Sequence, residues 1–202
     1  MSKTANDANK ACRISDVLLN VDDISIVFGG LRAVSNFSCT LKHGELVGLI
    51  GPNGAGKTTV FNMLSGIYTP TEGTICFTNA RNRVFPVHQK KPHQLSKLGI
   101  ARTFQNIRLF DNLTVEDNVL IAMHAQRKIN PLSAVFRTPA YYRDEKEQRE
   151  RVRKLLSLFK IESKVHDLAR NLPYGEQRKL EIVRALSTKP QLLLLDEPAA
   201  GM

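Results

Sequence analysis

One glycine-rich run places the strongest constraint on the fold of this 202-residue chain. It fits the pattern G-x-x-x-x-G-K-[ST] at every fixed position and reads Gly51-Pro52-Asn53-Gly54-Ala55-Gly56-Lys57-Thr58. Glycines at these positions let backbone N–H groups converge on a polyphosphate, and a helix N-terminus adds its positive dipole end. The Lys57 ammonium suits the outer phosphates, and the Thr58 hydroxyl suits Mg²⁺. The run predicts a nucleotide-binding loop.

The residues on either side of this loop predict the structural context that it requires. The apolar run Leu46–Ile50 before it predicts a buried strand. Thr59–Ser65 after it predicts a helix that ends at Gly66, with Thr59 in its first turn. Strand, loop and helix in this order make an ordinary glycine-rich turn the weaker interpretation.

A second motif, close to the end of the sequence, pairs an aliphatic strand with two acids. Gln191–Leu195 predicts a strand buried on both faces, and Asp196 and Glu197 follow it directly. Carboxylates at the carboxyl end of such a strand lie where ligands bind in open α/β sheets. Asp196 is suited to hold Mg²⁺ through water, and Glu197 to polarise a water molecule aimed at a γ-phosphate.

The remainder of the N-terminal half predicts short β-elements. Val17–Phe28 alternates apolar and polar residues, Gly29-Gly30 breaks it, and Val34–Leu41 is its expected hairpin partner. Another strand is expected at Thr74–Phe77. The polar, basic and proline-interrupted segment Asn79–Lys91 predicts a loop.

From residue 115 onward the sequence becomes helical in character. Val115–Met123 follows a Thr114 that can cap it, and Glu176–Ser187 predicts another helix. Between them, beyond a loop around Asn130-Pro131, lies a long charged helix. Its apolar side chains have i, i+3, i+4, i+7 spacing, and we interpret this stripe as core packing: Val152, Leu155, Leu156 and Phe159.

Composition limits the class of protein. The longest aliphatic run, Leu192–Leu195, is far shorter than the roughly 18 apolar residues of a membrane span. Residues 1–16 are polar, lack the apolar stretch of a secretory signal and predict a disordered tail. The net charge of +10 suits nucleic acid or an anionic lipid surface, but much of it alternates in sign as on a solvated helix. No motif that reads DNA or RNA accompanies it, so we expect no nucleic-acid partner.

Two further motifs lie between the phosphate loop and the acidic pair, at Arg102–Gln105 and Leu172–Glu181. Together with those two motifs they resemble the Q-loop and signature of ABC transporter ATPases. Four longer segments resemble the sequences of the ATP-binding subunits of branched-chain amino acid importers. They are Phe28–Val34, Gly51–Phe61, Arg102–Phe110 and Pro198–Gly201. This resemblance runs from about Val17 to the last residue. Urea/amide-type importer ATPases have similar text, and the lipopolysaccharide-export ATPase is a more distant relative.

The resemblance implies a role for individual residues. Phe28 would stack on adenine, although a core aromatic of the hairpin is the alternative. Gln105 would contact Mg²⁺ and the attacking water, with a surface amide as the alternative. Tyr174, Gly175 and Glu176 would meet the γ-phosphate of ATP held by a second subunit, at a helix N-terminus. Since Pro173 has no hydroxyl where the family usually has serine, these contacts would use backbone N–H groups from Gly175 onward.

The resemblance also implies a fold and a function. The fold is α/β: a P-loop NTPase sheet in a domain at 17–202, with an N-terminal antiparallel β-subdomain and an inserted helical subdomain at about 112–172. The activity is Mg²⁺-dependent ATP hydrolysis that drives import of branched-chain amino acids. The partners are a second ATPase subunit, identical or paralogous, two membrane permeases and, indirectly, a periplasmic binding protein. The location is the cytoplasmic face of the membrane, as a peripheral subunit. The alternative is an ABC ATPase associated with DNA or translation.

One departure from the family affects whether this chain folds stably and hydrolyses ATP. The sequence stops at Gly201-Met202, before the further strands, switch histidine and C-terminal helices of the family. We expect the Leu192–Leu195 strand to lack neighbours, at a cost of roughly 25 cal/mol for each Å² of exposed apolar area. We therefore expect that this chain is a fragment of a longer protein, and that the fragment is marginally folded and hydrolyses ATP poorly.

Overall fold

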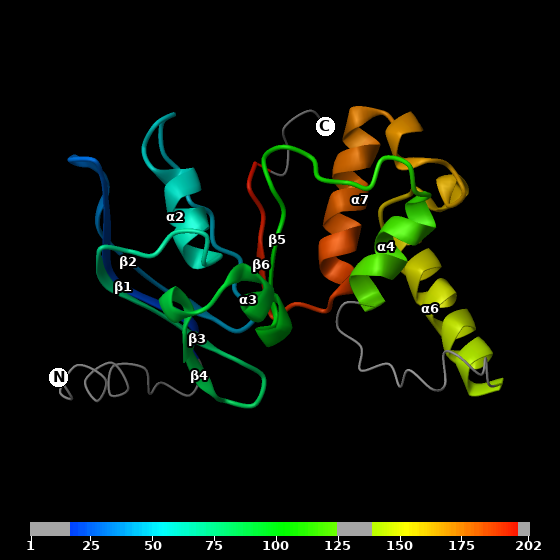
Figure 1. The fold of residues 1–202 in the computed structure, drawn as a ribbon, viewed down its shortest axis with the longest axis horizontal. Helices are drawn as coiled ribbons and strands as arrows, with labels where there is room; N and C mark the ends of the chain where they lie inside the picture. Colours follow the sequence, from blue (N-terminus) through cyan, green and yellow to red (C-terminus); the bar gives the residue numbers. More distant parts are fainter. Residues whose placement is uncertain (1–16, 125–138, 198–202) are drawn as a thin grey trace. The chain divides into compact units, whose positions relative to one another are not determined.

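The computed structural model describes residues 17–124 and 139–197, with the side chains of 139–141 left out. The predicted tail at 1–16, the loop around Asn130-Pro131 and the Pro198–Gly201 segment lie outside the described residues. Two compact units divide the chain, residues 1–101 and 102–202, and each is described by itself (Figure 1). No helix among the described residues is long and apolar enough to cross a membrane.

A four-stranded antiparallel sheet forms the first unit. Its strands are β1 (Val17–Phe28), β2 (Leu31–Lys42), β3 (Glu72–Thr78) and β4 (Val84–Pro86), in the order β2-β1-β3-β4. The β1–β2 hairpin closes at the Phe28–Leu31 pair. Gly29 and Gly30 make its two-residue turn at φ 50° and 93°, and two positive φ values are what a type I′ turn requires. The predicted hairpin is confirmed, with β2 longer at both ends.

Three helices of this unit lie within residues 17–101. They are α2 (Lys57–Leu64), the one-turn 3₁₀ helix η1 (Val87–Gln89) and α3 (Pro92–Leu98). The predicted helix after the phosphate loop is confirmed by α2. The expected loop at Asn79–Lys91 is wrong in part, because β4 pairs with β3 and places Phe85 opposite Phe77. Neither η1 nor α3 was expected, although proline at the start of α3 and Gly99 after it are ordinary helix boundaries.

The strand predicted at Leu46–Ile50 is wrong. This segment has no strand assignment, and Leu46 and Ile50 are 99% and 94% exposed. A continuous apolar run predicts a strand buried on both faces only where neighbouring strands cover it. No strand among the described residues pairs with this run.

The strand β5 (Ile100–Arg102) leads from the first unit into the second, which is mainly helical. Its helices among the described residues are α4 (Val115–His124), α6 (Pro139–Leu158), η2 (Glu162–Lys164), η3 (Ala169–Asn171) and α7 (Tyr174–Ser187), and β6 (Leu192–Leu194) follows them. The three helices predicted from Val115 onward are confirmed, and so is the predicted cap. The Asp117 N–H donates to the Thr114 hydroxyl oxygen at 3.1 Å.

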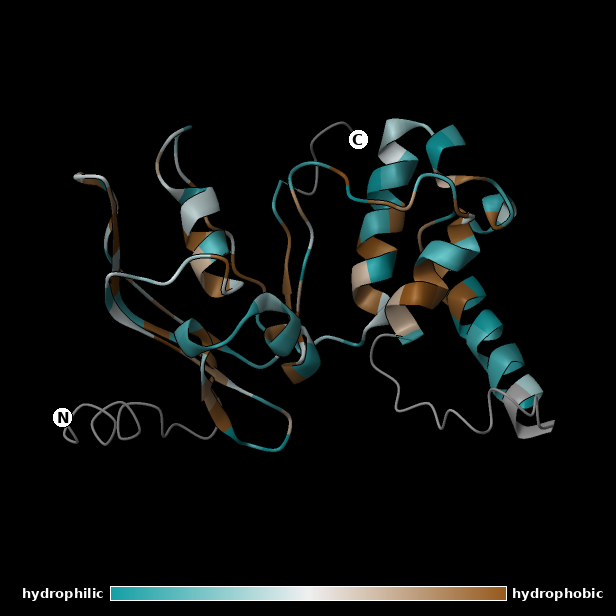
Figure 2. Ribbon diagram, viewed as in Figure 1, coloured by the Kyte–Doolittle hydropathy of each residue, from teal (hydrophilic) through white to brown (hydrophobic). Residues whose placement is uncertain are grey.

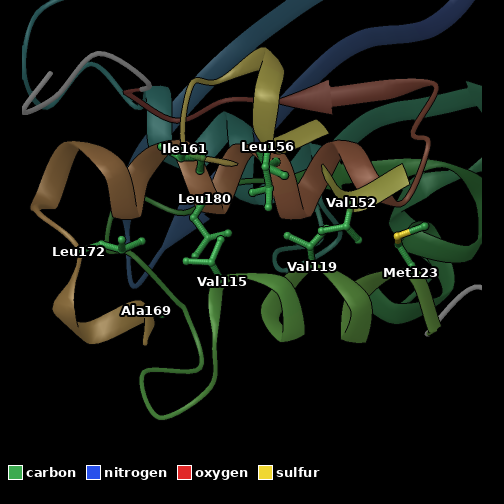
Figure 3. Packing of buried hydrophobic residues seen from close by; sticks show 10 residues of the cluster. Val115, Val119, Met123, Val152, Leu156, Ile161, Ala169, Leu172 and Leu180 are labelled. Carbon is green, nitrogen blue, oxygen red and sulfur yellow. The ribbon is translucent and has the colours of Figure 1, made fainter. Parts of the chain in front are cut away.

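The facing sides of α4, α6 and α7 bury one apolar cluster, which Figure 3 shows in close view. Figure 2 shows the same division along α4 and α7, with hydrophobic faces turned toward neighbouring helices. The predicted stripe on α6 packs as expected, since Val152 and Leu156 are fully buried and Leu155 and Phe159 pack against the cluster. Its buried members are Val115, Val119, Met123, Val152, Leu156, Ile161, Ala169, Leu172, Leu180 and Val183.

The last described strand is better covered than we expected. Leu192 and Leu194 of β6 are only 5% and 6% exposed. The last residue of this strand is also hydrogen-bonded within the same unit, because the Thr103 N–H donates to the Leu194 carbonyl at 3.0 Å. The expectation that this strand lies exposed is therefore wrong, and the exposed apolar run is Leu46–Ile50.

Two leucines on α6 test the packing of this unit. Leu156 is fully buried in the cluster, whereas Leu158 is 75% exposed. Leu156→Ala should lower the free energy of unfolding by about 2–5 kcal/mol, because it leaves a cavity. Leu158→Ala should change it by no more than about 0.5 kcal/mol. Chemical denaturation followed by circular dichroism measures both, and equal losses would contradict the packing.

Candidate nucleotide-binding site

The phosphate loop and the start of α2 are the candidate anion site of the first unit. Helix α2 begins at Lys57, with Gly56 as its N-cap and no acidic residue in its first turn. The Val60 N–H bonds to the Gly56 carbonyl at 2.9 Å, so the N–H groups of Lys57, Thr58 and Thr59 precede the first intrahelical bond. Such a helix end favours phosphate through its N–H groups and its dipole.

Two glycines give the loop its path. Gly54 and Gly56 have φ of 83° and 82°, a region that L side chains rarely adopt. A Cβ on Gly56 would also lie 2.7 Å from the Ala33 carbonyl oxygen of β2, whereas a Cβ on Gly54 would meet nothing within 4 Å. The sheet therefore approaches the loop at Gly56 closely enough to exclude any side chain. Between them, the Ala55 N–H donates to the Pro52 carbonyl at 3.2 Å and closes a tight turn.

The Lys57 side chain folds back across its own loop. Its ammonium donates to the carbonyl oxygens of Gly51 at 2.7 Å and Pro52 at 2.8 Å. The positive charge is thereby held at the loop. Asn53 and Thr58 are exposed beside it.

Phe28, predicted to stack on adenine, lies at the end of β1 and is 42% exposed. Its ring meets the ring of Tyr68 edge to face, with centroids 5.2 Å apart and planes at 69°. The Tyr68 backbone N–H donates to the Asn62 carbonyl of α2 at 3.2 Å, so the tyrosine is fixed to the same helix that begins at the phosphate loop. Sequence reasoning did not single out Tyr68. An exposed aromatic just after a helix is common and carries little information.

The acidic pair and the Q-loop residue lie in the second unit. Asp196 is 5% exposed and accepts a bond from Arg102 Nη2 on Oδ2 at 3.1 Å, while Glu197 and Gln105 are exposed. Burial lowers the pKa of the Arg102 guanidinium, and the hydrogen bond to Asp196 opposes this shift. Glu197 has a φ of 48°, which is uncommon for a residue with a side chain.

The signature residues occupy the first turn of α7. Tyr174 is 51% exposed, and Glu176 pairs with Lys164 of η2 at 2.6 Å. The N–H groups of Glu176 and Gln177 both donate to the Pro173 carbonyl, at 2.9 and 3.0 Å. These two N–H groups, which we expected to contact phosphate, therefore already have an acceptor within the helix. Of the N–H groups named in that prediction, the one of Gly175 remains as a donor to phosphate.

Sequence reasoning missed a buried charge pair on α7. Arg178 and Glu181 are 1% and 2% exposed, and their side chains meet at 2.7 Å. Arg178 donates to the carbonyl oxygens of Phe104, Asp196 and Glu197, and Glu181 accepts from the Phe104 N–H at 3.2 Å. The only trace of this network in the sequence is the i, i+3 spacing of opposite charges, which exposed helix faces share.

The donor sets fit ATP and Mg²⁺. The loop glycines, Lys57 and the first turn of α2 offer N–H groups and positive charge for phosphates. Among the described residues no group of three or more His, Cys, Asp or Glu side chains is placed to hold a metal. The Thr58 hydroxyl in the first unit, and the Gln105 and Asp196 side chains in the second, are oxygen groups of the kind that Mg²⁺ binds.

Glycine substitution tests the approach of the sheet to the loop. Gly56→Ala should lower the free energy of unfolding by more than the about 1–2 kcal/mol that positive φ alone costs, because its Cβ would collide with the Ala33 carbonyl. Gly54→Ala has almost the same φ and open space, so it should show only the φ cost. Denaturation without nucleotide compares them. A smaller loss for Gly56→Ala would show that the contact is not as close as described.

Comparison with known proteins places the chain in a family. The ABC transporter family matches residues 34–200. LivG of Salmonella typhimurium, a high-affinity branched-chain amino acid transport ATP-binding protein, is 44% identical over 94% of this chain and 72% of its own length. BraF of Pseudomonas aeruginosa, described in the same words, is 41% identical over the same shares of both chains.

Solved structures agree. The crystal structure of the ADP conformation of MJ1267, an ATP-binding cassette of an ABC transporter, matches 92% of this chain and 70% of its own, with 31% identity and a TM-score of 0.72. The α/β fold that the resemblance implied is confirmed. On these comparisons, the chain belongs to the ATP-binding cassettes of the ABC transporter family.

Proposed function

We propose that this chain is the ATP-hydrolysing subunit of an importer for branched-chain amino acids. The observation that carries the proposal is the 44% identity with LivG across 94% of the chain. The family match at residues 34–200 extends over the phosphate loop, the Q-loop, the signature and the acidic pair. The local geometry of these motifs supports it, since a helix start with Lys57 and no acid in its first turn is suited to a polyphosphate.

Binding of ATP is assigned to the first unit. The loop from Gly51 to Thr59 holds the phosphates through N–H groups and the Lys57 ammonium, and Phe28 stacks on adenine. The contact of Phe28 with Tyr68 limits the positions of its ring. Thr58 supplies an oxygen for Mg²⁺, whose charge offsets that of the phosphates, and Gln105 and Asp196 of the second unit are proposed to supply oxygens of the same kind.

Hydrolysis is assigned to groups that position and polarise water. Glu197 accepts a proton from the attacking water, and Gln105 orients it. Lys57 stabilises the charge of the transferred phosphoryl group. Tyr174, Gly175 and Glu176 serve ATP bound to a second subunit, identical or paralogous, with Gly175 offering its N–H at the start of α7.

The assembly follows from this assignment. Two such subunits act at the cytoplasmic face of the membrane on two permeases, which receive amino acids from a periplasmic binding protein. The chain has no part in choosing the amino acid. A urea/amide importer would use the same ATPase chemistry, so transport must be measured to distinguish the two.

Replacing the loop lysine tests ATP binding by the chain itself. Lys57→Ala should weaken binding of a fluorescent ATP analogue at least about tenfold, because a hydrogen bond to a charged group contributes about 1.5–3 kcal/mol. Lys97→Ala, an exposed lysine of α3 in the same unit, should bind as the parent does. Equal affinities of the Lys57→Ala variant and its parent would remove the loop from the site.

Replacing Glu197 tests the function in the assembled transporter, with its permeases and binding protein in vesicles. The parent should couple ATP hydrolysis to uptake of leucine, isoleucine or valine. Glu197→Gln should bind ATP yet lower hydrolysis and uptake by about 100-fold or more, since it removes the general base. Glu150→Gln, on the exposed surface of α6, is the control. Uptake of urea or short amides instead would favour the alternative, and parental turnover by Glu197→Gln would exclude Glu197 from the reaction.

A further inference from the structure

The buried Arg178–Glu181 pair lies at the point where three functional segments of the second unit meet. These segments are the signature helix α7, the Q-loop at Arg102–Gln105, and the acidic pair at Asp196 and Glu197. Both charges are withdrawn from water, and their side chains are 1% and 2% exposed. Burying two charges is costly unless each is paired and further hydrogen-bonded, and here each is.

The two side chains bond to the backbone through defined atoms. Arg178 Nη1 donates to Glu181 Oε2 and to the Phe104 carbonyl, while Glu181 Oε1 accepts the Phe104 N–H at 3.2 Å. The peptide groups on both sides of Phe104 are therefore fixed by the two charges together. Arg178 Nη2 donates to the carbonyl oxygens of Asp196 and, at 3.1 Å, of Glu197.

Two exposed side chains lie next to the peptide groups that the pair holds. Gln105 comes directly after Phe104, and both Gln105 and Glu197 are exposed to solvent. Glu197 also has a φ of 48°, so its backbone is in a region that needs support from its surroundings. The guanidinium bonded to its carbonyl gives that support. A planar group with five donors in a fixed fork can serve two segments at once, which the single ammonium of lysine cannot do in the same geometry.

We infer that Arg178, held by Glu181, is a positioning residue for ATP hydrolysis: it fixes the Gln105 and Glu197 backbones relative to the signature helix. A movement of α7 would be transmitted through one guanidinium to both segments at the same time. The first turn of α7 is proposed to contact ATP bound to a second subunit. Arg178 would therefore couple that contact to Gln105 and Glu197, which act on the ATP of their own subunit. This inference rests on the proposed function.

The test replaces both charges together, as Arg178→Met with Glu181→Leu. Removing one charge would leave the other buried and unpaired, whereas replacing a buried ion pair by apolar residues of similar volume often leaves stability unchanged or raised. The control is Glu116→Leu with Arg149→Met, a pair between α4 and α6. Glu116 is 3% exposed and the Arg149 side chain is 43% exposed, and neither bonds to Phe104, Asp196 or Glu197.

Kinetics in the assembled transporter separate positioning from folding. The Arg178→Met/Glu181→Leu variant should melt as a folded protein, keep the KM for ATP and lose about 100-fold in kcat, since displacing a reacting group by about 1 Å costs this much. The control pair should keep the parental kcat. Parental kcat in the Arg178→Met/Glu181→Leu variant, or equal losses in both variants, would overturn the inference.

Amide hydrogen exchange gives a readout that needs no turnover. The Phe104 N–H loses its acceptor in the Arg178→Met/Glu181→Leu variant and should exchange faster, whereas the neighbouring Thr103 N–H, bonded to Leu194, should not change. Unchanged exchange at Phe104 would show that the pair does not hold the Q-loop. A parent transporter without ATP hydrolysis would instead refute the proposed function, and exchange at Phe104 would still decide whether the pair holds the loop.

Discussion

A guanidinium buried without water must find its partners within the protein, and the second unit is organised around one that does. Arg178 reaches the backbone on either side of its helix because the carbonyl oxygens at the end of β6 and at Phe104 need donors where they are covered. The same contact thereby satisfies buried backbone groups and connects segments far apart in the sequence. Removing it would leave several carbonyl oxygens and a carboxylate without partners at once, so these segments are expected to move together or not at all.

The apolar cluster of α4, α6 and α7 surrounds this polar centre on one side. Leu180 and Val183 of α7 belong to the cluster, while Arg178 and Glu181 of the same helix are buried in the polar contacts. One helix therefore carries both the hydrophobic contacts that stabilise the unit and the charges that meet the nucleotide motifs. The residues that make these two sets of contacts, Arg178 to Val183, lie within two turns of α7.

Local patterns predicted local structure well. The glycine-rich loop with its helix, the Thr114 cap and the stripe from Val152 to Phe159 depend on residues close together in sequence, and all are found as expected. The failures have one physical cause. Burial of Leu46–Ile50, exposure of Leu192 and the partners of Arg178 all depend on what distant segments cover, and in the sequence a buried arginine cannot be told from its exposed neighbours. The roles assigned to the site residues rest on resemblance and remain predictions.

The hydrogen bonds of Lys57 to its own loop affect how tightly an anion binds there. Its ammonium already has acceptors in the Gly51 and Pro52 carbonyl oxygens, so an incoming phosphate must displace these bonds. The measured affinity is then a difference between two sets of contacts, smaller than the strength of either. In return, the side chain loses little rotamer freedom on capture, because it is already held near its destination.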